Sequence, residues 1–408
     1  MKLLSLFSGI GAFECALNRC GIPFELAAFC ECDKHASEAY SLIHGESADK
    51  NLGDIRSAAC SRFFGVDCVC YGFPCQDISV AGRQRGFSHN GARTRSGLFF
   101  EAARIIRECM PKIAIAENVK ALTSKKFKAE FDIVLGELSA AGYVNYWAVL
   151  NARDFGLPQN RERVFIVSIR ADIDAGFEFP APVPLSLRLA DVLERDVPEK
   201  FFIKETERTR EIVEKYAKSV IKNDGAILRQ IGKLKDGNYG SCGSIQDRVY
   251  DARGISPTLN TGSTTNPRIV AMRGRPDDDG RNVQKLEPRP DECSNALTTV
   301  QKDNLLLEPN VGHNPISKKL EFNGFNTDVS HCLIATDYKA PKCSITPDFR
   351  IRKLTPLECW RLQGFTDAEF DRAKNGGISD TQLYKMAGNS IAIPVLCAIF
   401  EKLRRYFD

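Results

Sequence analysis

The sequence predicts an α/β protein built on a doubly wound, mostly parallel sheet, with a smaller β/loop-rich domain inserted into it. Three observations predict this fold. Short apolar runs alternate with helical patterns from residue 2 to residue 170. A glycine-rich turn, Gly9-Ile10-Gly11, joins the first apolar run to the first helical pattern. Prolines cluster at residues 180–184, and polar residues, Gly and Pro then dominate until about residue 345. We therefore expect the first domain at 1–178, the insertion at 179–345 and a return to the first domain at 346–408.

Composition excludes several classes of protein. A chain of 408 residues with 43% hydrophobic and 26% charged residues is large enough for two folded domains. The net charge of +4 permits nucleic acid binding without predicting it. No signal-peptide pattern and no apolar run of about 20 residues is present, so we expect a cytoplasmic protein without a membrane segment. The 15 cysteines are expected to be reduced, and no metal site is expected because the cysteine spacings are not those of zinc sites.

The first two strand–helix units place acidic residues where a nucleotide-like ligand would bind. Residues 2–8 and 24–31 are expected to be strands, and a helix is expected to begin at Phe13. Glu31 lies about 20 residues beyond the glycine turn, where a doubly wound fold places the acid that binds a ribose. Asp33 and Asp54 follow. Each acid alone is also typical of a helix N-cap, but three in succession favour a ligand-binding edge.

The segment Gly72-Phe73-Pro74-Cys75-Gln76 follows a buried apolar run, residues 66–71, that is expected to be a strand. A cysteine just past the carboxyl end of such a strand stands where open α/β sheets place their chemistry. Cys75 is therefore a candidate nucleophile, and an inert buried thiol is the alternative. The next 20 or so residues are rich in Gly and Arg, which is typical of a mobile loop that closes on a polyanion.

Further along, helices are expected at residues 97–110 and 126–141, and strands at 112–116, 143–150 and 164–170. Glu117 directly follows one of these strands and can reach the same crevice as Cys75. Gln159, Arg161 and Arg163 alternate before the last strand and would share one face. A polar ligand and a solvated edge strand both explain that face.

The inserted region contains a short pattern that recurs at about 36–38 residues, which is the range of structural repeats. The three copies begin at Ser256, Ser294 and Ser330, and we interpret them as hairpin-like units. After the insertion, Thr355-Pro356 is typical of a helix start. Gly388-Asn389-Ser390 is expected to cap a closing helix at 391–405.

Nine segments in this order resemble those of the DNA (cytosine-5)-methyltransferases, of the bacterial or phage type. The segments that match span about 240 residues of the chain. The insertion corresponds by position to the target-recognition domain of the family. Ser8 and Ala12 depart from the commoner Ala and Gly, but both are small. The segments are Phe7–Gly11, Glu31 with Asp33, Gly53–Ile55, Gly72–Gln76, Gly97–Phe99, Glu117–Val119, Gln159–Arg163, Arg352–Phe365 and Gly388–Ser390.

The resemblance implies a Rossmann-like methyltransferase sheet that binds S-adenosylmethionine, with no metal. By matching position, Phe7 would stack on the adenine, Glu31 would hold the ribose, and Asp54 would accept from the adenine amino group. The full set of implied cofactor-binding residues is Phe7, Ser8, Gly9, Gly11, Glu31, Asp54, Pro74, Leu98, Asn389 and Ser390.

The resemblance also implies methyl transfer to C5 of a cytosine flipped out of duplex DNA. Cys75 would attack C6, which makes C5 nucleophilic. Glu117 would bond N3 and the exocyclic amine, and Arg163, with Arg161, would hold O2. Gln159 would support the loop or contact DNA. The other implied DNA-contacting residues are Ser79, Arg83, Gln84 and Arg85.

Two rival interpretations accompany the DNA methyltransferase. The family resemblance extends to tRNA cytosine-5 methyltransferases, although the large insertion favours recognition of a DNA sequence. An inactive DNA-binding relative is the second rival, and the presence of both Cys75 and Glu117 argues against it. We expect a monomer that acts on double-stranded DNA, with a cognate restriction endonuclease as a candidate partner.

Overall fold

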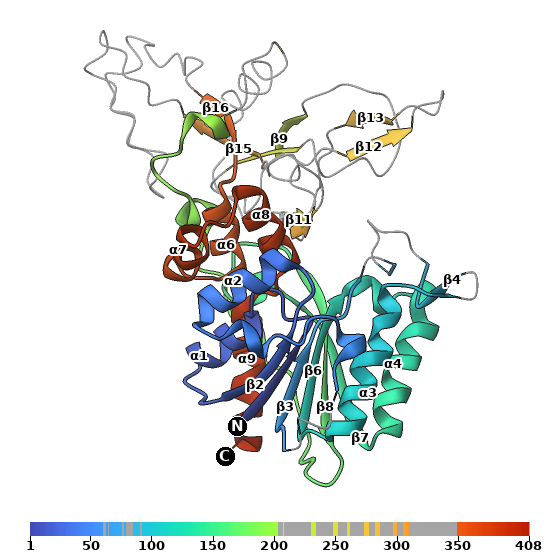
Figure 1. The fold of residues 1–408 in the computed structure, drawn as a ribbon. Helices are drawn as coiled ribbons and strands as arrows, with labels where there is room; N and C mark the ends of the chain where they lie inside the picture. Colours follow the sequence, from blue (N-terminus) through green and yellow to red (C-terminus); the bar gives the residue numbers. More distant parts are fainter. Residues whose placement is uncertain are drawn as a thin grey trace, which may run out of the picture.

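A six-stranded sheet in the order β2-β1-β3-β6-β8-β7 forms the centre of the fold (Figure 1). The structure is a computed structural model. It describes residues 1–59, 63, 65–75, 77–78, 85–89, 92–202, 207 and 349–407. Between residues 230 and 309 it describes seven short strands and no other residues. The strands of the central sheet are β1 (Lys2–Leu6), β2 (Glu25–Cys30), β3 (Cys68–Tyr71), β6 (Ile113–Val119), β7 (Tyr143–Asn151) and β8 (Glu162–Arg170).

The first four strands of this order are parallel, and β8 runs antiparallel to both β6 and β7. All six strands were expected from the apolar runs. The strand predicted at 112–116 is longer than expected, because Asn118 and Val119 continue the pairing with Val164 and Arg163 of β8. Glu117 therefore lies inside β6 and is held by its backbone ladder.

Both faces of the sheet are buried, as a doubly wound fold requires. Along β3, Cys68 and Cys70 pack into one core cluster while Val69 and Tyr71 pack into the other, because successive side chains point to opposite faces. Helices α1, α2 and α9 line the first cluster, and α3 and α4 line the second (Figure 1). Their bounds are α1 (Ala12–Arg19), α2 (Lys34–His44), α3 (Phe99–Cys109), α4 (Lys128–Ala140) and α9 (Ile393–Leu403).

Cap residues fix the C-terminal helices α6 (Pro356–Gln363), α7 (Asp367–Asn375) and α8 (Asp380–Asn389). Thr355 and Glu358 form a reciprocal capping box at the start of α6, which confirms the helix start predicted at Thr355-Pro356. The cap predicted at Gly388-Asn389-Ser390 is wrong. These residues end α8, and α9 begins after Ala392, because Pro394 occupies the first turn of α9.

The inserted region contributes short strands to separate small sheets. The strand β11 pairs in parallel with β14, and Leu259 lies in register with Leu297, so the described ends of the first two sequence repeats lie side by side. The third repeat, at Ser330, lies outside the described residues. The strands are β9 (Gln230–Lys233), β10 (Arg248–Asp251), β11 (Leu259–Thr261), β12 (Arg273–Pro276), β13 (Asn282–Lys285), β14 (Leu297–Thr299), β15 (Leu305–Pro309) and β16 (Phe349–Lys353).

The boundary near residue 178 stays a prediction. Leu189, Val192 and Phe201 all pack into the first core cluster, which favours a boundary after Phe202. Among the described helices, none is by itself long and apolar enough to cross a bilayer; α8 and α9 pass that test only as a pair bent by 42°.

Candidate active site

Cys75 lies at the carboxyl edge of the sheet, four residues beyond the end of β3 at Tyr71. Since Tyr71 pairs with Ala116, the loop after β3 runs beside Glu117 of β6. A side chain at Gly72 would lie 3.7 Å from the Glu117 carboxylate, so glycine leaves that carboxylate open toward the loop. Asn118 Nδ2 donates to the Phe73 carbonyl oxygen at 3.0 Å and fixes the loop to β6. Cys75 and Glu117, which were predicted on separate strands, therefore lie near one another where an open α/β sheet is expected to have its crevice.

Glu117 and Arg163 form an ion pair inside this crevice. Arg163 Nε lies 3.0 Å from Glu117 Oε1, and the two side chains are only 13% and 12% exposed. Burial raises the pKa of the Glu117 carboxyl, while the guanidinium groups of Arg163 and Arg161 oppose that shift. Burial thus favours the neutral carboxyl of Glu117, and the two guanidinium groups favour the ionised one.

The Cys75 thiol is half-buried and interacts with the same two arginines. Burial raises the pKa of the Cys75 thiol, Arg163 and Arg161 oppose that rise, and Glu117 adds to it. The structure thus brings together all four residues that the sequence assigned to catalysis. The two guanidinium groups and a backbone hydrogen bond to Cys75 favour the reactive thiolate.

Arg161 is buried away from solvent and holds the end of α8. Its guanidinium donates to the carbonyl oxygens of Gly388 and Ser390 at 3.2 and 2.5 Å. A cation at the C-terminus of a helix is favourable because the helix dipole is negative there. Arg163 is therefore the arginine that reaches Glu117, and Arg161 connects β8 to the turn at Ser390.

Gln159 is also fully buried, and its Nε2 donates to the Leu362 carbonyl oxygen of α6 at 2.6 Å. The expected DNA contact of Gln159 is not available from this position, because the side chain does not reach the surface. Its supporting role, the other expectation, agrees with this hydrogen bond.

The turn after β1 approaches Glu31 closely. The amide of Gly9 donates to Glu31 Oε2 at 2.9 Å, and the amide of Asp33 donates to Glu31 Oε1 at 2.7 Å. Burial raises the pKa of the Glu31 carboxyl, and both amides oppose the shift. Phe7 has a φ of +52°, a strained conformation for a non-glycine residue and one that concentrates at ligand sites. The Ser8 hydroxyl donates to Ser5 and Cys30 carbonyl oxygens and closes the turn.

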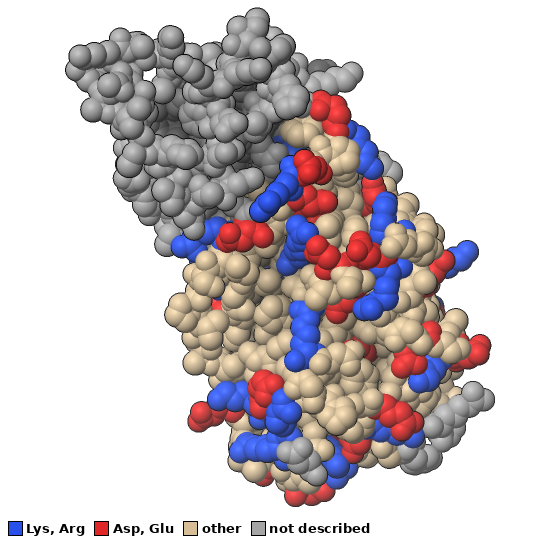
Figure 2. Space-filling model, turned by 90° about the vertical axis from the view of Figure 1, so that its left-hand side faces the viewer, with Lys and Arg blue, Asp and Glu red and all other residues tan. Residues whose placement is uncertain are grey.

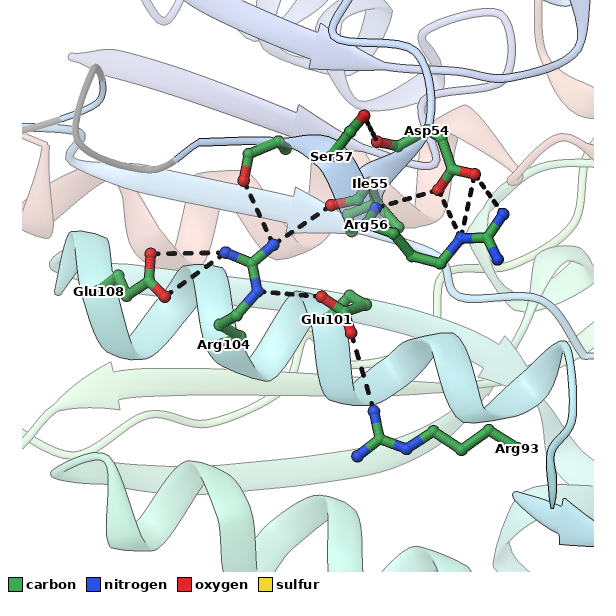
Figure 3. Close-up of polar contacts among 9 residues, drawn as sticks. Asp54, Ile55, Arg56, Ser57, Arg93, Glu101, Arg104 and Glu108 are labelled. Atoms are coloured by element: carbon green, nitrogen blue, oxygen red, sulfur yellow. Dashed lines mark hydrogen bonds and ion pairs between the residues drawn. The ribbon is translucent and has the colours of Figure 1, made fainter. Parts of the chain in front are cut away.

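The third acid of the series, Asp54, caps the short 3-10 helix at Ile55–Ser57. Its carboxylate accepts from the Arg56 amide and from Arg56 Nε, each at 3.0 Å (Figure 3). These bonds lower the pKa of Asp54 to about 2. Asp33 caps α2 in the same way, so two of the three acids are N-caps and only Glu31 is not.

The other residues expected at the cofactor are Pro74, Leu98, Asn389 and Ser390. Pro74 and Leu98 are half-buried, and Leu98 packs against the second core cluster. Asn389 is exposed, while Ser390 is buried. Ser390 Oγ is buried and has no hydrogen-bond partner among the described residues.

The family model described as C-5 cytosine-specific DNA methylase matches residues 1–405. The chain belongs to this family. The orphan methyltransferase M.SPRI of Bacillus phage SPR is 31% identical, over 99% of this chain and 97% of the relative. The type II methyltransferase M2.ScrFI of Lactococcus lactis subsp. cremoris is 32% identical, over 99% of each chain. The structure of the Entamoeba histolytica methyltransferase EhMeth, 16% identical, shares the fold with a TM-score of 0.59 over 99% of this chain and 98% of that one. The protein is a DNA cytosine-5 methyltransferase.

Sequence reasoning missed one residue of this methylase that organises the pocket. Asn51 Oδ1 accepts from the amides of Glu31 and Gly53, and its Nδ2 donates to the Glu31 carbonyl oxygen. Asn51 thus joins the strand end that carries Glu31 to the turn that carries Asp54. The sequence feature that could have indicated Asn51 is an amide side chain two residues before the Gly53-Asp54 turn.

The residues expected to contact DNA lie only partly within the described residues. Ser79, Arg83 and Gln84 lie outside the described residues, and Arg85 is exposed. The face drawn in Figure 2 carries interleaved Lys, Arg, Asp and Glu, so the described part of that face presents no extended basic field. Within the described ranges, no group of three or more His, Cys, Asp or Glu is placed to hold a metal ion.

Proposed function

We propose that this methylase transfers the methyl group of S-adenosylmethionine to C5 of a cytosine flipped out of duplex DNA, through a covalent bond between Cys75 and C6. The observation that carries the proposal is the convergence of Cys75, Glu117 and Arg163 in one crevice at the carboxyl edge of β3 and β6. A half-buried thiol beside a carboxyl and a guanidinium provides a nucleophile, a proton donor and a cation for one ring.

Each residue then has one task. Cys75 Sγ bonds to C6 and pushes the ring electrons toward C5, which takes the methyl group. Glu117, whose pKa burial raises, would hydrogen-bond N3 and the exocyclic amine and so relieve the charge that develops there. Arg163 holds Glu117 and reaches O2 of the base. The C5 proton then leaves to water, the C6–S bond breaks and the thiolate is restored.

The pocket around Glu31 suits the methyl donor, which supplies an electrophilic methyl group when bound. Glu31 Oε2 accepts from the Gly9 amide and Oε1 from the Asp33 amide, and a carboxylate has about four lone-pair sites, so Glu31 would also hold the two ribose hydroxyls. The buried Ser390 Oγ, which has no hydrogen-bond partner among the described residues, would bind a polar group of the same ligand. Phe7 would stack on the adenine, and Asp54 would accept from the adenine amino group after leaving Arg56.

We propose further that the region at 179–345 recognises the target sequence and that the enzyme acts as a monomer. Relatives named as an orphan and as a type II methyltransferase match this chain almost equally well. The proposed reaction requires neither a restriction endonuclease nor a second copy of the chain.

Bisulfite sequencing of a mixed-sequence plasmid, after incubation with the protein and S-adenosylmethionine, tests the activity. We expect protected cytosines in one short sequence context. Cys75→Ser should abolish protection and also the covalent adduct with a 5-fluorocytosine duplex, whereas Cys20→Ser, a half-buried thiol at the end of α1, should retain both.

Protection by Cys75→Ser at the wild-type rate would refute the nucleophile. If the wild-type protein protects no plasmid cytosine but methylates tRNA, the DNA substrate is refuted. If it does neither and traps nothing, the inactive relative is correct.

A further inference from the structure

Arg104 lies on α3, outside the crevice, and binds the turn that carries Asp54 (Figure 3). Its Nη2 donates to the carbonyl oxygens of Ile55 and Ala58, each at 3.3 Å. Its Nε donates to Glu101 Oε2 at 2.9 Å, and its Nη1 faces Glu108 at 3.4 Å. One guanidinium therefore joins a helix of the catalytic core to two carbonyl groups of a loop about 46–49 positions away in sequence.

The helix orients this guanidinium before it meets the loop. Glu101 and Glu108 lie three residues before and four residues after Arg104, so all three side chains share one face of α3. The opposite face, with Ala102, Ile105 and Ile106 among its members, is buried in the core. The two carboxylates take Nε and Nη1, which leaves Nη2 to the loop. Because the guanidinium is planar, hydrogen bonds at Nε and Nη1 also fix the direction in which Nη2 donates.

The turn at 54–58 has an anchor at each end. Asn51 accepts from the amide of Gly53, just before the turn. Arg104 donates to the carbonyl oxygens of Ile55, inside the turn, and of Ala58, at its end. Between these anchors, Asp54 hydrogen-bonds within its own turn: its carboxylate accepts from the amide and guanidinium of Arg56, and its carbonyl oxygen accepts from the amide and hydroxyl of Ser57. The place of the Asp54 carboxylate is therefore set by the backbone on either side of it.

We infer that Arg104 is a positioning residue for the nucleoside end of the methyl donor, acting through the Asp54–Ala58 turn. This inference rests on the proposed cofactor site. A ligand that contacts Asp54 binds more tightly when the turn is already in place, because less backbone freedom is lost on binding. Arg104 touches neither the cofactor nor the base, so its effect falls on cofactor affinity and leaves the chemical step unchanged.

The test compares Arg104→Met with Arg107→Met. Arg107 lies one turn along α3, and its guanidinium binds Glu137 of α4 at 2.6 Å, away from the turn. Loss of two hydrogen bonds predicts that Arg104→Met raises KM for S-adenosylmethionine, and Kd for S-adenosylhomocysteine, by about tenfold, with kcat at saturation within about twofold of wild type. Arg107→Met should leave all three constants unchanged.

A second readout depends on the adenine itself. The wild-type enzyme should prefer S-adenosylhomocysteine to its inosine counterpart, which lacks the amino group that Asp54 would bind, and Arg104→Met should reduce this preference. A general loss of stability would weaken both ligands alike. Arg104→Lys keeps the charge with a single donor group, so it should fall between wild type and Arg104→Met, and it serves if the methionine variant does not fold.

Cofactor constants of Arg104→Met and Arg104→Lys equal to those of Arg107→Met would overturn the inference, as would a fall in kcat at unchanged KM. Failure of the wild-type protein to bind S-adenosylhomocysteine at all would instead overturn the proposed cofactor site. The two failures are distinguished by the wild-type measurement alone.

Discussion

Arg163 interacts at once with the nucleophile and with the acid of the proposed mechanism. It opposes the burial that raises the pKa of Cys75 and that of Glu117. Replacing it with methionine should therefore raise both pKa values further. For Cys75 the reactive form is the deprotonated one, so a higher pKa means less thiolate at any pH below it.

Arg163→Met should shift the pH profile of Cys75 alkylation by iodoacetamide to higher pH, measured by mass spectrometry of the Cys75 peptide. It should also lower kcat/KM by about a hundredfold, since a cation at the developing charge is lost. Arg170→Met is the control, because Arg170 lies at the far end of the same strand and pairs with Asp172. An unshifted alkylation profile would show that Arg163 does not act on the thiol.

Sequence reasoning could place Cys75, Glu117 and Arg163 at one edge of the sheet because each follows, ends or begins an apolar run whose position in the sheet can be predicted. It could not assign Arg161 or Gln159 with the same detail. Their hydrogen-bond partners lie 227–229 and 203 positions away, beyond the insertion. No local pattern carries that information, because the pairing exists only once α6 and α8 have packed against β8.

At the scale of elements, the turn at Gly9–Gly11 packs closely against His44 of α2. Gly11 has a φ of +80°, and a side chain there would overlap the imidazole of His44, which binds the Ile10 carbonyl oxygen. Gly21 also has a positive φ, of +61°, but a side chain there would meet nothing within 4 Å. Comparing alanine variants at these two glycines therefore separates the cost of backbone strain from the cost of steric overlap.

Gly21→Ala should lower the free energy of unfolding by about 1 kcal/mol, from backbone strain alone. Gly11→Ala should lower it by about 3 kcal/mol, because His44 must also move. It should also weaken S-adenosylhomocysteine binding, since the displaced turn carries the Gly9 amide that holds Glu31. Denaturant unfolding and calorimetric titration provide both numbers, and equal losses for the two variants would contradict the role of His44.

The helices α7 and α8 could not be predicted from the apolar pattern of the sequence. Each spans about ten residues or fewer and begins at a Thr or Ser cap that follows a Gly or a short loop, so neither presents a long apolar period. The motif Gly388-Asn389-Ser390 was placed correctly as a helix boundary but assigned to the wrong helix. A Gly-Asn-Ser turn ends one helix as readily as it precedes another, and only the packing of α8 against α6 decides between them.

At the scale of the whole molecule, the chain returns from the insertion through β16, and a buried ion pair secures that return. Both guanidinium Nη atoms of Arg352 lie 2.8 Å from the carboxylate of Glu358, and both side chains are fully buried. The same carboxylate accepts from the amides of Thr355 and Glu194. It therefore joins β16, α6 and the segment that leads into the insertion.

Breaking this pair from one side should cost more than breaking a surface pair, because an uncompensated charge stays buried. Arg352→Met is expected to lower the free energy of unfolding by about 3–5 kcal/mol. Arg352→Met combined with Glu358→Gln should recover part of that loss, since no buried charge remains. Lys374→Met, which breaks an exposed pair with Asp380, should cost less than about 1 kcal/mol.

The unfolding of this junction can be followed by fluorescence, because Trp360 of α6 is fully buried and only Trp147, which is 46% exposed, competes with it. In a Trp147→Phe background, the Trp360 signal reports α6 directly. A double variant no more stable than Arg352→Met would show that the cost comes from lost packing of the arginine stem and not from the unpaired carboxylate. A midpoint for Arg352→Met equal to that of Lys374→Met would show that the buried pair does not secure the return of the chain.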